Sequence, residues 1–202
     1  MTSVMPSVTT SILTAAALGF LVLAALVAYA ATRPDAFRVA RSLAIAAPAE
    51  RLFPLINDLR AMSGWNPYAL RDPGATGAYS GPPSGRGAVH TFAGPKSGTG
   101  RIEIIEAVAP RAVTMRLTMQ KPFAADNTVR FTLEPNGAAT TVTWAMEGRS
   151  HLIGKLIGLV VDCDAMVGKD FAQGLANLRA LVETQTARPQ AVAGADEAIA
   201  AR

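Results

Sequence analysis

The chain of 202 residues has little of what sulfur, metal and nucleic-acid chemistry require. It holds one cysteine, Cys163, and two histidines, His90 and His151, which excludes an internal disulfide and the common zinc-ligand sets. One cysteine fits a reducing compartment, although many exported bacterial proteins also lack disulfides. The net charge is +4 and the basic residues are scattered, so there is no clustered footprint for phosphates. We therefore expect no metal, no cofactor and no nucleic-acid partner.

Signatures of nucleophilic catalysis and nucleotide binding are also missing. The sequence has no G-x-S-x-G motif, and Cys163 lies in an apolar stretch typical of a small buried side chain. Gly85-Arg86-Gly87 and Gly98-Thr99-Gly100 both come before expected strands, not between a strand and a helix. We therefore interpret these two glycine motifs as hairpin turns.

One long apolar run is present near the N-terminus. After a flank over 1–10, it extends from Ser11 to Ala31 without a charged residue, and a helix of that length reaches roughly 30 Å, the thickness of a bilayer's hydrocarbon core. Arg33, Arg38 and Arg41 follow the run, and no Lys or Arg precedes it. The positive-inside rule then predicts a single-pass helix in the cell membrane, with the following domain in the cytoplasm.

A cleaved signal peptide is the alternative interpretation of this run. Ala28-Tyr29-Ala30 resembles an A-x-A cleavage site, and cleavage would export the domain. The length of the run and the lack of a basic residue before it favour a retained anchor.

The rest of the chain alternates between strand and helix patterns. Residues 37–46 predict a first strand, Pro48 opens a helix with Phe53, Ile56 and Leu59 on its apolar face, and 63–68 is a second short helix or a turn. Residues 77–87 are predicted to be a loop. Five strands follow, predicted over 88–93, 101–108, 112–120, 127–134 and 140–148. Odd spacing places Glu103 and Glu106 on opposite faces of their strand.

The C-terminal region predicts a long helix over 162–183, because apolar residues recur there at steps of three and four. Residues 151–161 before it are a short helix or a flexible lid, and 184–202 are predicted to be a disordered tail. Strands and helices in separate runs indicate one α+β domain over 32–183. A curved antiparallel sheet cannot touch a straight helix along its whole length, so we expect a cavity between them.

The order of motifs over 37–183 resembles the START-like (SRPBCC) superfamily, and within it the polyketide cyclase/dehydrase and lipid-transport family. The resemblance rests on an ordered set: 45–48 and 52–58, Trp65-Asn66-Pro67-Tyr68, Gly85-Arg86-Gly87-Ala88, Gly98-Thr99-Gly100, Lys121-Pro122-Phe123, 140–144, Gly168-Lys169-Asp170-Phe171 and 174–178. It implies a helix-grip fold whose cavity holds a lipid or another hydrophobic small molecule. It does not fix a reaction, because one fold carries many functions.

Bulky apolar residues are the predicted lining of that cavity. They are Trp65, Phe92, Met115, Met119, Phe131, Trp144, Met146, Val167 and Phe171. Each of these side chains could instead fill the core.

Three polar residues are candidates for catalysis if the protein is an enzyme: His90, Tyr68 and Arg116. For His90 the pattern favours an outward, solvated side chain. We therefore expect a membrane-anchored module that binds or transports a hydrophobic molecule. A cyclase or dehydratase using the same cavity is one alternative, and a regulatory interaction module without a ligand is another.

Overall fold

A computed structural model describes residues 8–150, 152–159 and 162–200. The contacts divide the chain into two units, one with residues 1–37 and 150–162, the other with residues 38–149 and 163–202. Residues 151 and 160–161 lie outside the described residues. They include His151 and belong to the segment 151–161, which was predicted to be a short helix or a flexible lid.

The first unit is built on the apolar helix α1 (Val8–Thr32). Its stretch Ser11–Thr32 is long and apolar enough to cross a membrane, a test that signal sequences also pass. The short helix α5 (Leu152–Ile157) packs against α1 in the same unit. Asp35 holds this unit together, because its carbonyl oxygen accepts a hydrogen bond from Ser150 N at 2.7 Å and its carboxylate forms an ion pair with Lys155.

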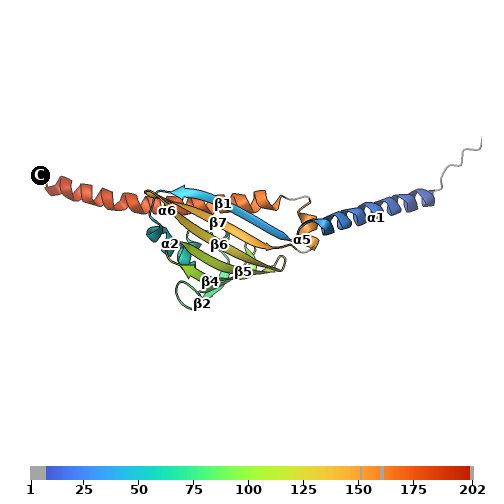
Figure 1. Cartoon of the computed structure of the whole chain (residues 1–202), viewed down its shortest axis with the longest axis horizontal. Helices are drawn as coiled ribbons and strands as arrows, with labels where there is room; N and C mark the ends of the chain where they lie inside the picture. The colour runs from blue at the N-terminus through green and yellow to red at the C-terminus, as the bar shows by residue number, and fades with distance from the viewer. Residues whose placement is uncertain (1–7, 151, 160–161, 201–202) are drawn as a thin grey trace, which may run out of the picture. The chain divides into compact units, whose positions relative to one another are not determined.

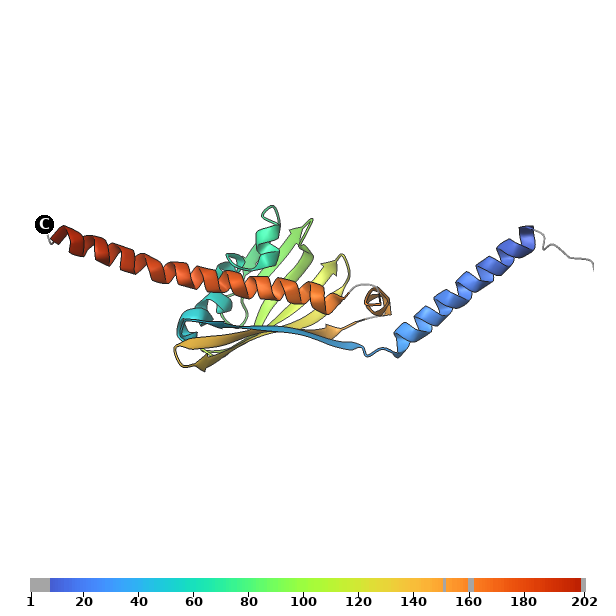
Figure 2. The ribbon, with the colours of Figure 1, turned by 90° about the horizontal axis from the view of Figure 1, so that it is seen from above.

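The second unit is a seven-stranded antiparallel sheet crossed by a long helix (Figures 1 and 2). The strand order is β1-β7-β6-β5-β4-β3-β2. The strands are β1 (Ala36–Ile45), β2 (Thr76–Ser80), β3 (Val89–Gly94), β4 (Gly98–Val108), β5 (Ala112–Lys121), β6 (Ala125–Asn136) and β7 (Ala139–Arg149). The predicted α+β helix-grip architecture is confirmed.

Three short helices connect β1 to β2. In α2 (Ala49–Asn57) Leu52, Phe53 and Ile56 are buried, and Pro48 is the N-cap residue just before the helix, not its first residue. Leu59 belongs to a separate helix, α3 (Leu59–Ser63), because the Asp58 side chain accepts hydrogen bonds from the backbone N–H groups of residues 60 and 61 and starts a new helix. The Asn66 side chain caps α4 (Pro67–Arg71) in the same way.

Two predictions about the elements are wrong. The loop predicted over 77–87 includes all but the first residue of β2, which pairs with β3 from Thr76↔Ala93 to Ser80↔Val89. Its glycines and prolines hid the short edge strand, although edge strands tolerate such residues. The helix α6 (Cys163–Ala200) continues through 184–200, where a disordered tail was predicted. Alanine, the strongest helix former, is frequent there.

Candidate functional site

The register of the sheet determines which side chains face α6. Residues that pair across antiparallel strands share a face, so the pairs Phe131↔Trp144, Val129↔Met146 and Asn127↔Gly148 form successive rows on the inner face. From β5, Val113, Met115 and Leu117 extend the same three rows. The inner face can therefore be followed row by row from one end of the strands to the other.

At one end the inner face is closed by an aromatic cluster of Trp65, Phe131, Trp144 and Phe171. Trp144 stacks on Phe171 with ring centroids 4.3 Å apart, and Trp65 meets Phe131 edge-on at 5.9 Å. All four side chains are buried. Trp65 Nε1 also donates to the Leu55 carbonyl oxygen at 3.0 Å. We call this part, with the rows of Val113 and Leu133, the closed half.

Gly174 lets α6 approach the closed half. A Cβ at this position would lie 2.5 Å from Cζ3 of Trp144 and 2.9 Å from Cδ of Pro67. Because real Cβ atoms do not come so close, the helix can pack against the tryptophan only where the side chain is a hydrogen atom. Sheet and helix therefore meet directly in the closed half.

Towards the other end of the strands the inner face is only half-buried. Apolar side chains in successive rows are partly exposed there: Phe92, Ile102, Leu117, Met119 and Met146, with Val167 of α6. The turn after the last of these rows carries Phe123, a residue that is 60% exposed. We call this part the open half.

His90 lies in the open half, so the prediction of an outward, solvated side chain is wrong. Its partners Tyr79 and Ile102 belong to the inner face, and its ring stacks on Tyr79 with centroids 4.2 Å apart. Burial, and secondarily the charge of Arg60, lower the pKa of His90 below its usual value. His90 is therefore a neutral imidazole at pH 7 that can accept a proton.

Tyr68 lies at the contact of α4 with α6. Burial, and secondarily the charge of Asp170, raise the pKa of the Tyr68 phenol well above its usual value. Asp170 in turn forms an ion pair with Arg71 at 2.7 Å. This phenol therefore stays protonated at neutral pH, which excludes the phenolate as a base.

Arg116 lies on the outer face of the sheet, away from α6. It pairs with Glu103 and Thr128 in the register and forms an ion pair with Asp126 at 3.5 Å. The alternation along β5 already separates it from Met115 and Leu117. The structure thus removes Arg116 from the candidates for chemistry on the inner face.

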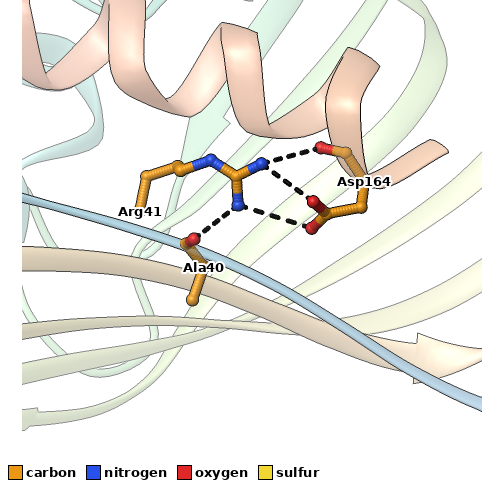
Figure 3. A network of polar contacts seen from close by, with 3 residues as sticks. All are labelled: Ala40, Arg41 and Asp164. Carbon is orange, nitrogen blue, oxygen red and sulfur yellow. Dashed lines mark hydrogen bonds and ion pairs between the residues drawn. The ribbon is translucent and has the colours of Figure 1, made fainter. Parts of the chain in front are cut away.

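Arg41 ties the start of α6 to β1 (Figure 3). Its guanidinium donates to the Asp164 carboxylate at 2.9 Å and to the Asp164 carbonyl oxygen at 3.2 Å. The hydrogen bond from Arg41 lowers the pKa of the Asp164 carboxyl. This contact holds the first turn of α6 above the edge strand β1.

The nine residues predicted to line the cavity divide between the two halves. Trp65, Met115, Phe131, Trp144 and Phe171 are buried and packed on one another or on their neighbours. Phe92, Met119, Met146 and Val167 are the half-buried ones. Leu117 and Asn127 share the same inner surface and were not predicted. Asn127 could have been found as the one polar residue in the alternation of Val129, Phe131 and Leu133.

A separate pocket of about 200 Å³ opens beside β2, between α3 and the segment 79–83. None of the nine predicted residues lines it, and it is smaller than the usual ligand site. Within the described part of the chain, no group of three or more His, Cys, Asp or Glu side chains could hold a metal ion.

The fold recurs in solved structures that share little sequence with the chain. A Chromobacterium violaceum protein, CV1439, is 19% identical with a TM-score of 0.53 over 75% of this chain and 99% of that one. MLL2253 from Mesorhizobium loti is 16% identical with a TM-score of 0.55 over 73% and 98%. DynU16, from the dynemicin biosynthetic locus, is 18% identical with a TM-score of 0.53 over 73% of this chain and 48% of that one.

No protein with curated function matches the chain. A family described as polyketide cyclase / dehydrase and lipid transport matches residues 36–183, which include the whole sheet and α6 as far as the end of its buried stripe. The chain belongs to the polyketide cyclase/dehydrase and lipid-transport family of the START-like superfamily.

Proposed function

We propose that the protein is a membrane-anchored module that binds a lipid or another hydrophobic small molecule on the open half of its sheet. The observation that carries the proposal is the division of one inner face into a packed half and a half-buried apolar half. A stable core buries such side chains, and exposed apolar rows are typical of binding surfaces. The open half offers Phe92, Leu117, Met119 and Met146 to a ligand.

The energetics favour an apolar ligand on this surface. Each buried CH₂ group contributes about 0.8 kcal/mol, and the thioethers of Met119 and Met146 adapt to irregular shapes. An anchor at α1 would keep the module beside the bilayer, which both supplies and receives hydrophobic molecules, and would raise their local concentration.

The test is to purify the full-length protein from its native membranes and identify co-purifying compounds by mass spectrometry. Leu117→Glu places a charge in the open half. Thr128→Glu places the same charge on the outer face of the neighbouring strand, opposite Arg116. We expect one class of hydrophobic compound in the wild type and in Thr128→Glu, and a loss of about tenfold or more in Leu117→Glu, since a buried charge without a partner is strongly unfavourable.

The same compounds at the same level in all three preparations would mean that they come from the detergent or the bilayer. That result would overturn the proposal and favour an interaction module without a ligand.

A second function, a cyclase or dehydratase, is favoured by one observation: the neutral His90 imidazole on the inner face. A neutral imidazole can remove a proton from a carbon next to a carbonyl group. If so, His90→Gln abolishes turnover of a polyketide-like substrate and leaves its binding unchanged. Loss of binding without any turnover in the wild type would contradict this second function.

A further inference from the structure

Two buried polar atoms on the inner face of the sheet have no hydrogen-bond partner. They are Nε1 of Trp144 and Oδ1 of Asn127, and the two residues are 3% and 8% exposed. Buried polar atoms in proteins are nearly always hydrogen-bonded, so each exception needs an explanation. The indole N–H is a donor only, and the amide oxygen is an acceptor only.

The geometry of Trp144 shows which way its N–H faces. The Cε3–Cζ3 edge of the indole lies against Gly174 of α6, and Phe171 covers one face of the ring. Nε1 is on the opposite edge of the indole. The donor is therefore turned away from the part of the closed half that Gly174 fills.

Asn127 is in the open half. It pairs with Leu117 on one side and Gly148 on the other, so its amide lies in an otherwise apolar row. The row of Met115, Val129 and Met146 separates it from the row of Trp144. Asn127 is four residues from Phe131, the partner of Trp144, which at about 3.3 Å per residue is roughly 13 Å along the strand.

From these placements we infer that the ligand is elongated and mainly apolar, with an oxygen function at each end. The inner oxygen accepts a hydrogen bond from Trp144 Nε1, and a hydroxyl group at the outer end donates to Asn127 Oδ1. The apolar middle lies against Met146, the half-buried residue of the row between them. This inference rests on the proposed binding function and narrows its ligand class, because a plain acyl chain with one head group leaves one of the two atoms unpaired.

The test uses three rigid probes that differ only in oxygen: biphenyl, 4-phenylphenol and 4,4′-biphenol. Binding to the full-length protein in phosphatidylcholine nanodiscs is measured by equilibrium dialysis, with empty nanodiscs correcting for partition into lipid. We expect each added hydroxyl group to tighten binding to the wild type by about fivefold to tenfold, the usual range for one hydrogen bond.

Two variants assign the hydroxyl groups. Trp144→Phe keeps a ring on Phe171 but removes the N–H, and Asn127→Leu removes the amide at similar volume. Each should lose about fivefold to tenfold for 4,4′-biphenol and nothing for biphenyl. Trp65→Phe is the matched control, because it removes an indole from the same cluster whose N–H already donates to Leu55. It should keep the preference for hydroxyl groups, and circular dichroism confirms the fold of each variant.

Failure of this ligand inference and failure of the proposed binding function give different results. If all three probes bind the wild type equally well, or if Trp65→Phe reduces the hydroxyl preference as much as Trp144→Phe, the inference is overturned while the binding function stands. If no probe binds above the level of empty nanodiscs, the proposed function itself is overturned.

Discussion

The closed half and the open half are built from the same strands with the same alternation of side chains, yet their side chains are buried to different degrees. In the closed half α6 approaches the sheet at Gly174 and four aromatic rings fill the space between them. In the open half the side chains are of the same kind but remain half-buried. The difference indicates that α6 packs closely against only part of the sheet, so that one end of the inner face is fully packed and the other keeps half-buried apolar side chains.

The largest test of this division is the removal of one ring from each half. Phe131→Ala, in the closed half, should lower the free energy of unfolding by about 3–5 kcal/mol, because a fully buried ring leaves a cavity. Phe92→Ala, in the open half, should lower it by about 1 kcal/mol, since that ring is already partly in water. Urea unfolding of the full chain in detergent micelles measures both, and equal losses would contradict the division.

Two glycines of α6 give a second test. Gly174→Ala should destabilise the protein by about 1–3 kcal/mol, because the added methyl group meets the rigid Trp144 ring. At Gly168 the methyl group would meet only the guanidinium of Arg41, the end of a flexible side chain. Gly168→Ala should change stability by less than about 1 kcal/mol, since the gain in helix propensity offsets a weakened ion pair. A thermal melt of each variant measures the loss of stability. A larger loss for Gly168→Ala than for Gly174→Ala would contradict the close packing of α6 against the sheet at Gly174.

Hydrogen bonds on β7 should differ in the same sense between the inner face, which carries Thr140, and the outer face, which carries Thr143. Thr140 is fully buried and donates to the Ala47 carbonyl oxygen at 2.7 Å. Thr140→Val should cost about 1–3 kcal/mol, because it leaves that carbonyl buried and unpaired. Thr143→Val, on the same strand as Thr140, removes an exposed contact with Ser42 of β1 and should cost under about 0.5 kcal/mol. Similar losses in urea unfolding would show that β7 is uniformly buried.

The smallest expected effect is the titration of His90. Its pKa is lowered in the folded protein, so the unfolded chain binds the proton more readily. Stability contributed by the neutral ring is therefore complete above the unfolded pKa of about 6.5 and decreases as the pH falls through that value towards the folded pKa. His90→Gln should remove this slope. An imidazole NMR titration with a midpoint at or above about 6.5 would contradict the placement of His90.

Much of the fold is predictable because periodicity records burial. A regular pattern of apolar residues identifies three elements directly. They are the strand from Val113 to Met119, the apolar stripe of α6 from Phe171 to Val182, and the apolar run of α1. β2 has no such pattern, because an edge strand of five residues needs few apolar side chains. A bulge between Ile104 and Glu106 was also invisible, and it brings Glu106 to the same outer face as Glu103, against the prediction of opposite faces.

The candidate site was predictable in composition but not in extent. Alternation identified Met115, Met119 and Trp144 as inward-facing, but burial depends on how closely α6 approaches, and that distance is set by Gly174 from a different element. His90 was assigned to the wrong face because one strand with few apolar residues does not show which face is covered. Only the pairing with Tyr79 and Ile102 decides this.

The two contacts of Asp35 determine where the chain lies if α1 crosses a bilayer. Asp35 comes three residues after the helix and holds both Ser150 and Lys155. The chain would then return to the lipid headgroups after the last strand, some 115 residues after leaving them, and α5 would rest at that boundary. A molecule leaving the bilayer would meet two segments of protein at its surface, one entering the sheet and one leaving it.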